Sequence, residues 1–224
     1  MHLVIVNCSP RTVLESNTNI IVEAFARGYT QRGNTAEIHH LSQKGTWDDI
    51  RTAFYANDNI LMALPLYVES VPGIMMEFLE TLTPKRDVPG GKRTKLAFLL
   101  QGGFAEASQL RCGERYLEKL PSYLNCDHNG TLIKGNMFVL HMMPPQSREK
   151  ITAPFVEMGR HFAEDESFQK AVIEAFAGPE YFSKAMIAFF TLITPLRKLF
   201  FHQFFKSKGC KGSLRAKPYE TNPT

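Results

Sequence analysis

Residues 2–18, HLVIVNCSPRTVLESNT, join a short apolar run to a connection crowded with small hydrogen-bonding side chains. The run at 2–6 is apolar and rich in β-branched residues, which is typical of a strand buried on both faces. From Asn17 to about Gln31 the pattern is that of an amphipathic helix. The stretch therefore predicts a buried strand that turns directly into a helix.

The same alternation of strand and helix continues along the chain. Four further apolar runs predict strands at 34–41, 59–66, 94–103 and 130–140. Helical patterns cover 46–58, 70–82, 107–120 and 148–163, the last interrupted by Pro154. Strands this apolar need cover on both faces, so we expect an α/β fold with a parallel sheet between layers of helices. Five strands joined by right-handed crossovers fit a flavodoxin-like, doubly wound sheet of order 2-1-3-4-5.

Length and composition set the domain organisation. The chain of 224 residues is long enough for one sizeable domain and an appendage. A break in the pattern at 176–182, FAGPEYF, predicts a domain at 1–178 and a helical C-terminal extension at 179–224. The content of 44% hydrophobic and 21% charged residues is that of a globular protein. The net charge of +4 is too small to indicate a nucleic-acid partner.

The cysteines and the N-terminal residues indicate in which compartment the protein is expected. The four cysteines are scattered without a CxxC pair, so neither a zinc site nor an iron–sulfur cluster is expected. Free thiols suit a reducing cytoplasm. The N-terminal run lacks the basic start of a signal peptide, and no apolar run reaches the roughly 18 residues of a membrane span. We therefore expect a soluble, cytoplasmic protein.

Three loops carry the functional prediction. In an open parallel sheet, a ligand binds beyond the carboxyl ends of the strands, near the point where the strand order reverses. In the predicted order that point lies between the first and third strands. The loops that meet there are 8–18, 65–71 and 101–106.

The loop 8–18 is suited to binding an anion. A helix N-terminus offers unpaired N–H groups and the positive end of a dipole. Arg11 can clamp a phosphate bidentately. Further donors are supplied by Ser9, Ser16, Asn17 and Thr18. The simpler alternative is that Ser16 or Asn17 only caps the helix. The patterns GxxxxGK[ST] and GxGxxG of other phosphate-binding loops are both absent.

The other two loops can form flat walls. The loop after the third strand offers stacking surface and backbone partners to a planar heterocycle. Its residues are Pro65, Leu66, Tyr67 and Val68. The alternative for Tyr67 is a half-buried place in the core. After the fourth strand, Gly102 and Gly103 permit close approach of the backbone or positive φ, and Phe104 caps the turn.

These segments occur in a recognisable order. They read CSPR…SNT after the first strand, PLYVESVPGIMMEFLE after the third and QGGF…Q after the fourth. Over residues 1–165 the chain thus resembles NADPH-dependent FMN reductases of the flavodoxin-like fold, in the branch related to iron–sulfur flavoproteins. Cys8 stands where that family usually has glycine, and the cysteine cluster of the iron–sulfur members is absent.

The resemblance implies an FMN cofactor and assigns its contacts. The FMN phosphate would be held by Ser9, Arg11, Ser16, Asn17 and Thr18. The isoalloxazine ring would be lined by Pro65, Leu66, Tyr67 and Val68. Its pyrimidine side would be closed by Gln101, Gly102, Gly103 and Phe104.

The activity that the resemblance implies is that of an NAD(P)H-dependent FMN reductase or quinone reductase. Hydride would pass from NAD(P)H, through FMN, to a small acceptor such as a quinone or a flavin, and the flavin itself would perform the chemistry. No catalytic side chain is then required, and no HExxH or GxSxG motif is present. Two alternatives stay open: a non-enzymatic FMN electron carrier, and a membrane- or partner-binding module that has lost the cofactor. Cys8 is either a redox-sensitive thiol or, as we expect, a small buried residue.

Residues 181–219 contain eight Lys or Arg residues, seven phenylalanines and no acidic residue. Such a segment can lie on an anionic membrane surface, or form two helices that pack on the body of the protein or on a second copy. Reductases of the resembled family commonly dimerise with the flavin near the interface. Packing, with a homodimer, is therefore the favoured prediction, and peripheral membrane contact is the alternative. The aromatic residues are Phe at helical spacing, which is not the stacking platform of a nucleic-acid arm.

Overall fold

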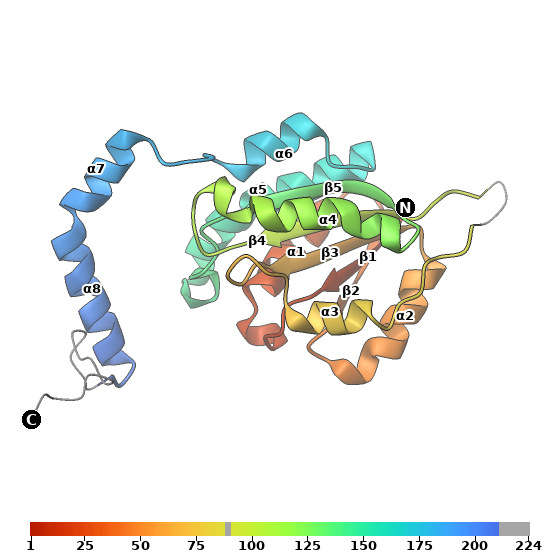
Figure 1. The fold of residues 1–224 in the computed structure, drawn as a ribbon, viewed down its shortest axis with the longest axis horizontal. Helices are drawn as coiled ribbons and strands as arrows, with labels where there is room; N and C mark the ends of the chain where they lie inside the picture. Colours follow the sequence, from red (N-terminus) through yellow and green to blue (C-terminus); the bar gives the residue numbers. More distant parts are fainter. Residues whose placement is uncertain (88–90, 211–224) are drawn as a thin grey trace, which may run out of the picture. The chain divides into compact units, whose positions relative to one another are not determined.

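The computed structural model describes residues 1–87 and 91–210. It contains a five-stranded, all-parallel sheet of order β2-β1-β3-β4-β5 (Figure 1). The strands are β1 (His2–Asn7), β2 (Thr35–His40), β3 (Asn59–Pro65), β4 (Lys95–Gln101) and β5 (Asp127–Lys134). The predicted parallel sheet and its strand order are confirmed.

Helices connect the strands and continue after the last of them. They are α1 (Asn17–Thr30), α2 (Trp47–Ala56), α3 (Gly73–Leu79), α4 (Arg111–Tyr123), α5 (Pro145–Asp165), α6 (Lys170–Ala177), α7 (Lys184–Leu192) and α8 (Thr194–Ser207). Short 3-10 turns occur at η1 (Val13–Glu15), η2 (Lys44–Thr46), η3 (Ala107–Leu110) and η4 (Leu140–Met142). The crossovers place helices on both faces of the sheet, which removes its apolar side chains from water.

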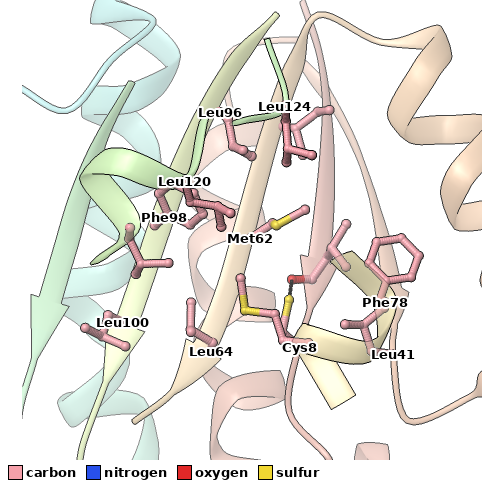
Figure 2. Close-up of a cluster of buried hydrophobic side chains, with 14 of the residues drawn as sticks. Cys8, Leu41, Met62, Leu64, Phe78, Leu96, Phe98, Leu100, Leu120 and Leu124 are labelled. Carbon is pink, nitrogen blue, oxygen red and sulfur yellow. Dashed lines mark hydrogen bonds between the residues drawn. The ribbon is translucent and has the colours of Figure 1, made fainter. Parts of the chain in front are cut away.

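Side chains along each strand alternate between two apolar clusters, one on either face of the sheet. In β1, Leu3 and Ile5 belong to the cluster beneath α1 and α5, and Val4 and Val6 to the cluster beneath α2, α3 and α4. Figure 2 shows the second cluster, where Met62 of β3 lies among side chains from β4 and α4. The period of two along a strand explains why every position of such a strand is apolar.

Helices α1 and α5 cross with almost no space between their backbones. A Cβ atom added to Gly28 would overlap the carbonyl oxygen of Val156, and one added to Gly159 would overlap the carbonyl oxygen of Phe25. Each helix therefore presents glycine to the backbone of the other. Aromatic rings fill the space beside the crossing, with Phe25 and Phe162 edge to face at 5.9 Å between centroids.

The fifth strand differs from its predicted bounds of 130–140. It begins earlier, at Asp127, and ends at Lys134. Asn136 has a positive φ of 63°, and the next N–H, that of Met137, donates to Gly102 O at 2.9 Å. These contacts lead the chain away from the sheet and across the end of β4. The segment after Lys134 is therefore a loop.

The sequence interpretation was also wrong about the last helix before the break at 176–182. Pro154 does not interrupt α5, which is continuous from Pro145 to Asp165. The proline is exposed, so its ring and the backbone acceptor that it leaves unpaired face solvent. Helix α6 follows without having been predicted, and it buries Phe176 against Phe155 at 5.1 Å between ring centroids.

The chain divides into two compact units between Tyr181 and Phe182. The first unit extends past the predicted boundary at 178 because residues 179 and 180 are bonded to it. Ala107 N donates to Pro179 O at 3.0 Å, and Arg111 pairs with Glu180 at 2.8 Å. All four cysteines are free.

The second unit contains α7 and α8. In the described residues, no single helix has both the length and the apolarity to cross a membrane. Taken together, α7 and α8 pass that test as a pair bent by 59°. The bend lies at Ile193, which caps α7 and precedes α8.

Candidate functional site

A cavity of about 420 Å³ opens at the carboxyl end of the sheet, where β1, β3 and β4 end. It is lined by Ser9, Arg11, Asn17, Thr18, Pro65, Leu66, Tyr67, Val68, Gln101, Gly102, Gly103, Phe104 and Phe138. The structure thus brings together every predicted site residue except Ser16, and adds Phe138. The volume lies in the range of pockets that bind small ligands and cofactors.

The turn after β1 is organised by two side chains that accept backbone hydrogen bonds. Ser9 N donates to Asn7 Oδ1 at 3.0 Å, and Arg11 N donates to Ser9 Oγ at 3.3 Å. Asn7 and Ser9 are both buried, so the turn is held from within. Because Ser9 Oγ accepts from the backbone, its own hydroxyl hydrogen remains available to a ligand in the cavity.

Ser16 does not line the cavity. It is fully buried and serves as the N-cap of α1, where its Oγ accepts from Asn19 N at 3.1 Å. The capping interpretation is therefore correct for Ser16, and a direct contact of its side chain with a ligand in the cavity is not expected. By fixing the start of α1, it holds the first N–H groups of the helix at the cavity.

The Asn17 side chain forms hydrogen bonds with the loop after β5, which is distant along the chain. Its Nδ2 donates to Met137 O at 2.8 Å and to Phe138 O at 2.9 Å, and its Oδ1 accepts from His141 N at 2.7 Å. These bonds use both amide hydrogens, so the side chain has no donor left for an anion. The group that Asn17 can offer to the cavity is its backbone N–H, at the start of α1.

Thr18 and Gln101 meet across the floor of the cavity. Gln101 Nε2 donates to Thr18 Oγ1 at 3.2 Å, and both residues are almost completely buried. The Thr18 hydroxyl hydrogen is then free to donate to a ligand. This bond connects the start of α1 with the end of β4, so it aligns two of the three predicted loops.

The loop after β3 is a tight two-residue turn. Tyr67 N donates to Ser70 O at 2.9 Å and Ser70 N donates to Tyr67 O at 3.0 Å. Between them, Val68 and Glu69 have positive φ values of 46° and 67°, which is strained for a β-branched residue. Tyr67 is 43% exposed and lines the cavity, so it is not a core aromatic.

The two glycines after β4 have different roles. Neither has a positive φ, contrary to one of the options from the sequence. A Cβ atom on Gly102 would lie 2.7 Å from Leu110 Cδ2, so this glycine makes room for the core. A Cβ atom on Gly103 would contact only Phe138 Cβ, at 3.6 Å, and both residues line the cavity.

Phe138 is the lining residue that the sequence did not predict. It lies in the loop after β5, is 63% exposed, and is held at the cavity by the bonds of Asn17. With Tyr67 and Phe104 it surrounds the cavity with partly exposed aromatic rings. Phe138 was missed because the sequence interpretation placed it in the fifth strand. The sequence carries no local signal for a contact between Phe138 and Asn17, which are far apart along the chain.

The charge of the site is suited to an anion. No Asp or Glu is among the lining residues, and Arg11 is the single charged one. The Arg11 side chain is exposed and forms no ion pair within the described ranges 1–87 and 91–210. Nor, in those ranges, do His, Cys, Asp or Glu side chains gather in a group that could hold a metal ion.

Cys8 points away from the cavity. Its side chain is fully buried in the cluster of Figure 2, where Sγ donates to Val6 O at 3.4 Å. Burial raises the pKa of the Cys8 thiol far above its ordinary value, so the thiol stays protonated. Of the two interpretations of Cys8, the structure supports the small buried residue.

The sheet order and the cavity at its switch point define a flavodoxin-like α/β protein. No model of a known protein family and no curated protein matches the chain. Solved structures of similar fold match it at low sequence identity.

One similar structure is the FMN-dependent NADH-azoreductase of Bacillus anthracis in complex with FMN, at 11% identity and a TM-score of 0.51, over 75% of this chain and 99% of the other. A second is the NAD(P)H:quinone oxidoreductase of Methanothermobacter marburgensis, at 15% identity and a TM-score of 0.52, over 75% and 99%. A third is general stress protein 14 of Treponema denticola in complex with FMN, at 12% identity and a TM-score of 0.52, over 73% and 98%. These likenesses establish the fold of the chain.

Proposed function

We propose that the chain is an FMN-dependent oxidoreductase that transfers hydride from NAD(P)H to a small acceptor such as a quinone or a flavin. The observation that carries the proposal is one cavity that joins an acid-free, donor-rich end to flat apolar walls. FMN has the same two parts, a phosphate and a planar ring system. The names of the similar structures, an azoreductase and a quinone oxidoreductase, support a small-molecule acceptor.

The donors at one end of the cavity fit a phosphate dianion. The hydroxyl hydrogens of Ser9 and Thr18 are free to point into the cavity, and the N–H groups of Asn17 and Thr18 begin α1. Arg11 adds a positive charge without an ion-pair partner in the described residues. Donors around a helix N-terminus are the usual protein solution for binding phosphate.

The other end fits the ring. Pro65 to Val68 form one wall, and the turn at Gly103 and Phe104 forms another. The partly exposed rings of Tyr67 and Phe138 give stacking surface and leave the cavity accessible from solvent. NAD(P)H and the acceptor would bind at this site one after the other, so the cavity has to be accessible from solvent.

When bound, FMN supplies the hydride chemistry, accepting from NAD(P)H and donating to the acceptor. The side chains have the task of binding and orientation. Ser9 and Thr18 would donate hydrogen bonds to the phosphate and Arg11 would offset part of its charge. The backbone at Gly103 would meet the edge of the ring. No lining group is an acid or a base of ordinary pKa near neutrality, so the protein itself moves no proton in this proposal.

The electron-carrier alternative is less well supported. Carriers that dock on partner proteins through flavin usually surround it with acidic residues, whereas this cavity has none. Steady-state oxidation of NAD(P)H with a quinone distinguishes the two, because a carrier turns over slowly without its partner. A homodimer stays a prediction from the resemblance, and light scattering of the purified chain measures it.

The test of the proposal is a comparison of FMN with riboflavin, which lacks the phosphate, by quenching of flavin fluorescence. We expect FMN to bind at least about tenfold more tightly, because charge-assisted hydrogen bonds contribute about 1.5–3 kcal/mol each. Arg11→Ala is expected to weaken the binding of FMN and to leave the binding of riboflavin unchanged.

Gly103→Ala tests the ring end. The added methyl group meets only Phe138 Cβ, at 3.6 Å, and both residues line the cavity, so we expect weaker binding of both flavins with unchanged thermal stability. Gly45→Ala is the matched control, because a Cβ atom there meets nothing within 4 Å. Equal affinity of wild-type protein for FMN and riboflavin, or no quenching of either, would contradict the proposed function.

A further inference from the structure

The second unit carries charge of one sign only. Its described residues, from Phe182 to Cys210, include Lys184, Arg197, Lys198, Lys206 and Lys208 and neither Asp nor Glu. The imbalance extends over residues 181–219, with eight basic residues and no acidic one. A partner that complements this charge is anionic.

The large apolar side chains of the same helices are exposed. None of the described side chains of α7 and α8 is buried, and Leu192, Leu196 and Phe200 are 79%, 67% and 62% exposed. The exposed set also contains Met186, Ile187, Phe189, Leu199, Phe201 and Phe205. Apolar surface of this extent is unfavourable in water and marks an interaction surface.

Helix α8 carries a row of basic side chains and two rows of aromatic rings, and Arg197 lies on the aromatic side, three and four residues before Phe200 and Phe201. Lys198, His202 and Lys206 recur every four residues and therefore share one face of the helix. The rings form two stacked pairs, also four residues apart, with centroids 6.4 and 6.2 Å apart: Phe200 with Phe204, and Phe201 with Phe205. Long basic side chains beside exposed aromatic rings are typical of a segment at a membrane interface, because the charged ends can reach the headgroups while the rings insert.

The dimensions of the helices favour a place on the surface over a span. Helix α7 has 9 residues and α8 has 14, and a span requires about 20 in one helix. Arg197 and Lys198 lie in the first turn of α8, midway along the pair, where a span would carry them to the centre of the bilayer. Lying flat, the pair keeps these charges at the headgroups.

We infer that the helix pair α7–α8 is a docking surface for an anionic lipid bilayer, with Phe and Leu side chains inserted at the headgroup boundary and Lys and Arg near the lipid phosphates. Pairing of α7–α8 with the same helices of a second copy is disfavoured as the occupant, because like charges would meet. A nucleic acid would match the charge but not the exposed Leu, Ile and Met side chains. The inference is independent of the proposed function, since it uses no residue of the cavity.

The experiment is flotation of the full-length chain with vesicles of phosphatidylcholine, alone or with about 30% phosphatidylserine. We expect binding to the anionic vesicles only, and its loss in about 1 M salt, where the screening length is about 3 Å. Lys198→Gln with Lys206→Gln removes two charges, each worth about fivefold, so the partition coefficient should fall about 25-fold. Lys119→Gln with Lys150→Gln, at exposed lysines of the first unit, is the charge control and should change little.

A second pair of variants tests the apolar contribution. Phe201→Ser with Phe205→Ser should lower the partition at least about tenfold, because two rings would no longer insert at the headgroup boundary. Tyr123→Ser, at a 74% exposed ring of the first unit, is its control. Failure to bind anionic vesicles, or equal binding to neutral ones, would overturn the inference. The alternative outcome is a wild-type chain that forms a dimer, fails to bind vesicles, and loses the dimer in Phe201→Ser with Phe205→Ser. That result would assign the surface to a second copy.

Discussion

Two adjacent residues at the start of α1 hold different parts of the site. Ser16 turns inward and caps the helix, and Asn17 turns outward and binds the loop that carries Phe138. The helix N-terminus and an aromatic wall of the cavity are thereby fixed by one dipeptide. A substitution of Asn17 would disturb the cavity through Phe138, even though the Asn17 side chain has no donor left for a ligand.

A short chain of hydrogen bonds links a histidine to the same turn. Asn7 Oδ1 accepts from Ser9 N, which directs the Asn7 amide nitrogen to His40 Nδ1 at 3.2 Å. A nitrogen that faces an N–H donor must be the unprotonated one, so this bond belongs to the neutral imidazole. Burial, opposed by Glu23 and aided by His39, lowers the pKa of His40 in the same direction.

This arrangement predicts how stability depends on pH. Because the pKa of His40 is lower in the folded chain, the unfolded chain takes up the proton first as the pH falls. The contribution of the neutral imidazole is complete above its ordinary pKa of about 6.5, and it is lost as the pH falls from that value through the lower pKa of the folded chain. We expect His40→Gln to flatten the decline of the unfolding free energy between neutral and mildly acidic pH.

Denaturant unfolding at several pH values measures the effect. His161→Gln, at an exposed position of α5, is the control and should follow the wild-type decline. An equally steep decline in His40→Gln would mean that other groups carry the acid sensitivity.

At the scale of elements, the crossing of α1 and α5 brings two helix backbones into close contact. An alanine at Gly159 would place its Cβ atom on the carbonyl oxygen of Phe25, which is backbone and cannot turn aside. We expect Gly159→Ala to destabilise the chain by about 1–3 kcal/mol, the usual cost of overpacking, although alanine is the better helix former.

Gly73→Ala provides the comparison for the helix crossing. Gly73 is the first residue of α3, and a Cβ atom there meets nothing within 4 Å. Its substitution should be neutral or stabilising in the same denaturant titration. Similar losses of stability in both variants would show that helix propensity, and not the crossing, decides the effect.

The elements also show what a sequence can and cannot predict. The buried strands and the three loops at their carboxyl ends were predictable, because apolar runs and polar turns are local patterns and parallel strands end at one edge. The end of β5 was not, because it depends on bonds from Met137 to Gly102 and from Asn17 to Phe138. Phe138 was missed for the same reason. Gln101 and Thr18 were both predicted, but the bond between them follows only from the assembled sheet.

At the scale of the whole molecule, the division after Tyr181 predicts that the first unit folds alone. Truncation after Tyr181 keeps α6 and the pair of Arg111 with Glu180, which holds the pKa of that carboxyl below its usual range. We expect this truncated chain to retain the unfolding free energy and the flavin affinity of the full chain, and to lose its binding to anionic vesicles.

A shorter chain that ends at Gln169 is the matched comparison. It lacks α6, whose Phe176 is buried against Phe155 and whose Phe176 O accepts from Lys134 Nζ at 2.6 Å. Its unfolding free energy should be clearly lower. If the chain that ends at Tyr181 were equally unstable, the two units would not fold separately.

The turn at Val68 and Glu69 has one more consequence, which concerns entropy. Its two backbone hydrogen bonds, between Tyr67 and Ser70, fix the position of the aromatic wall within a strained backbone. A ligand that enters the cavity then meets a preorganised surface, and the ordering cost of about 0.5–1.5 kcal/mol per immobilised side chain is met when the protein folds rather than when the ligand binds. The strained turn thus raises the affinity of the site, because it orders this wall before a ligand binds.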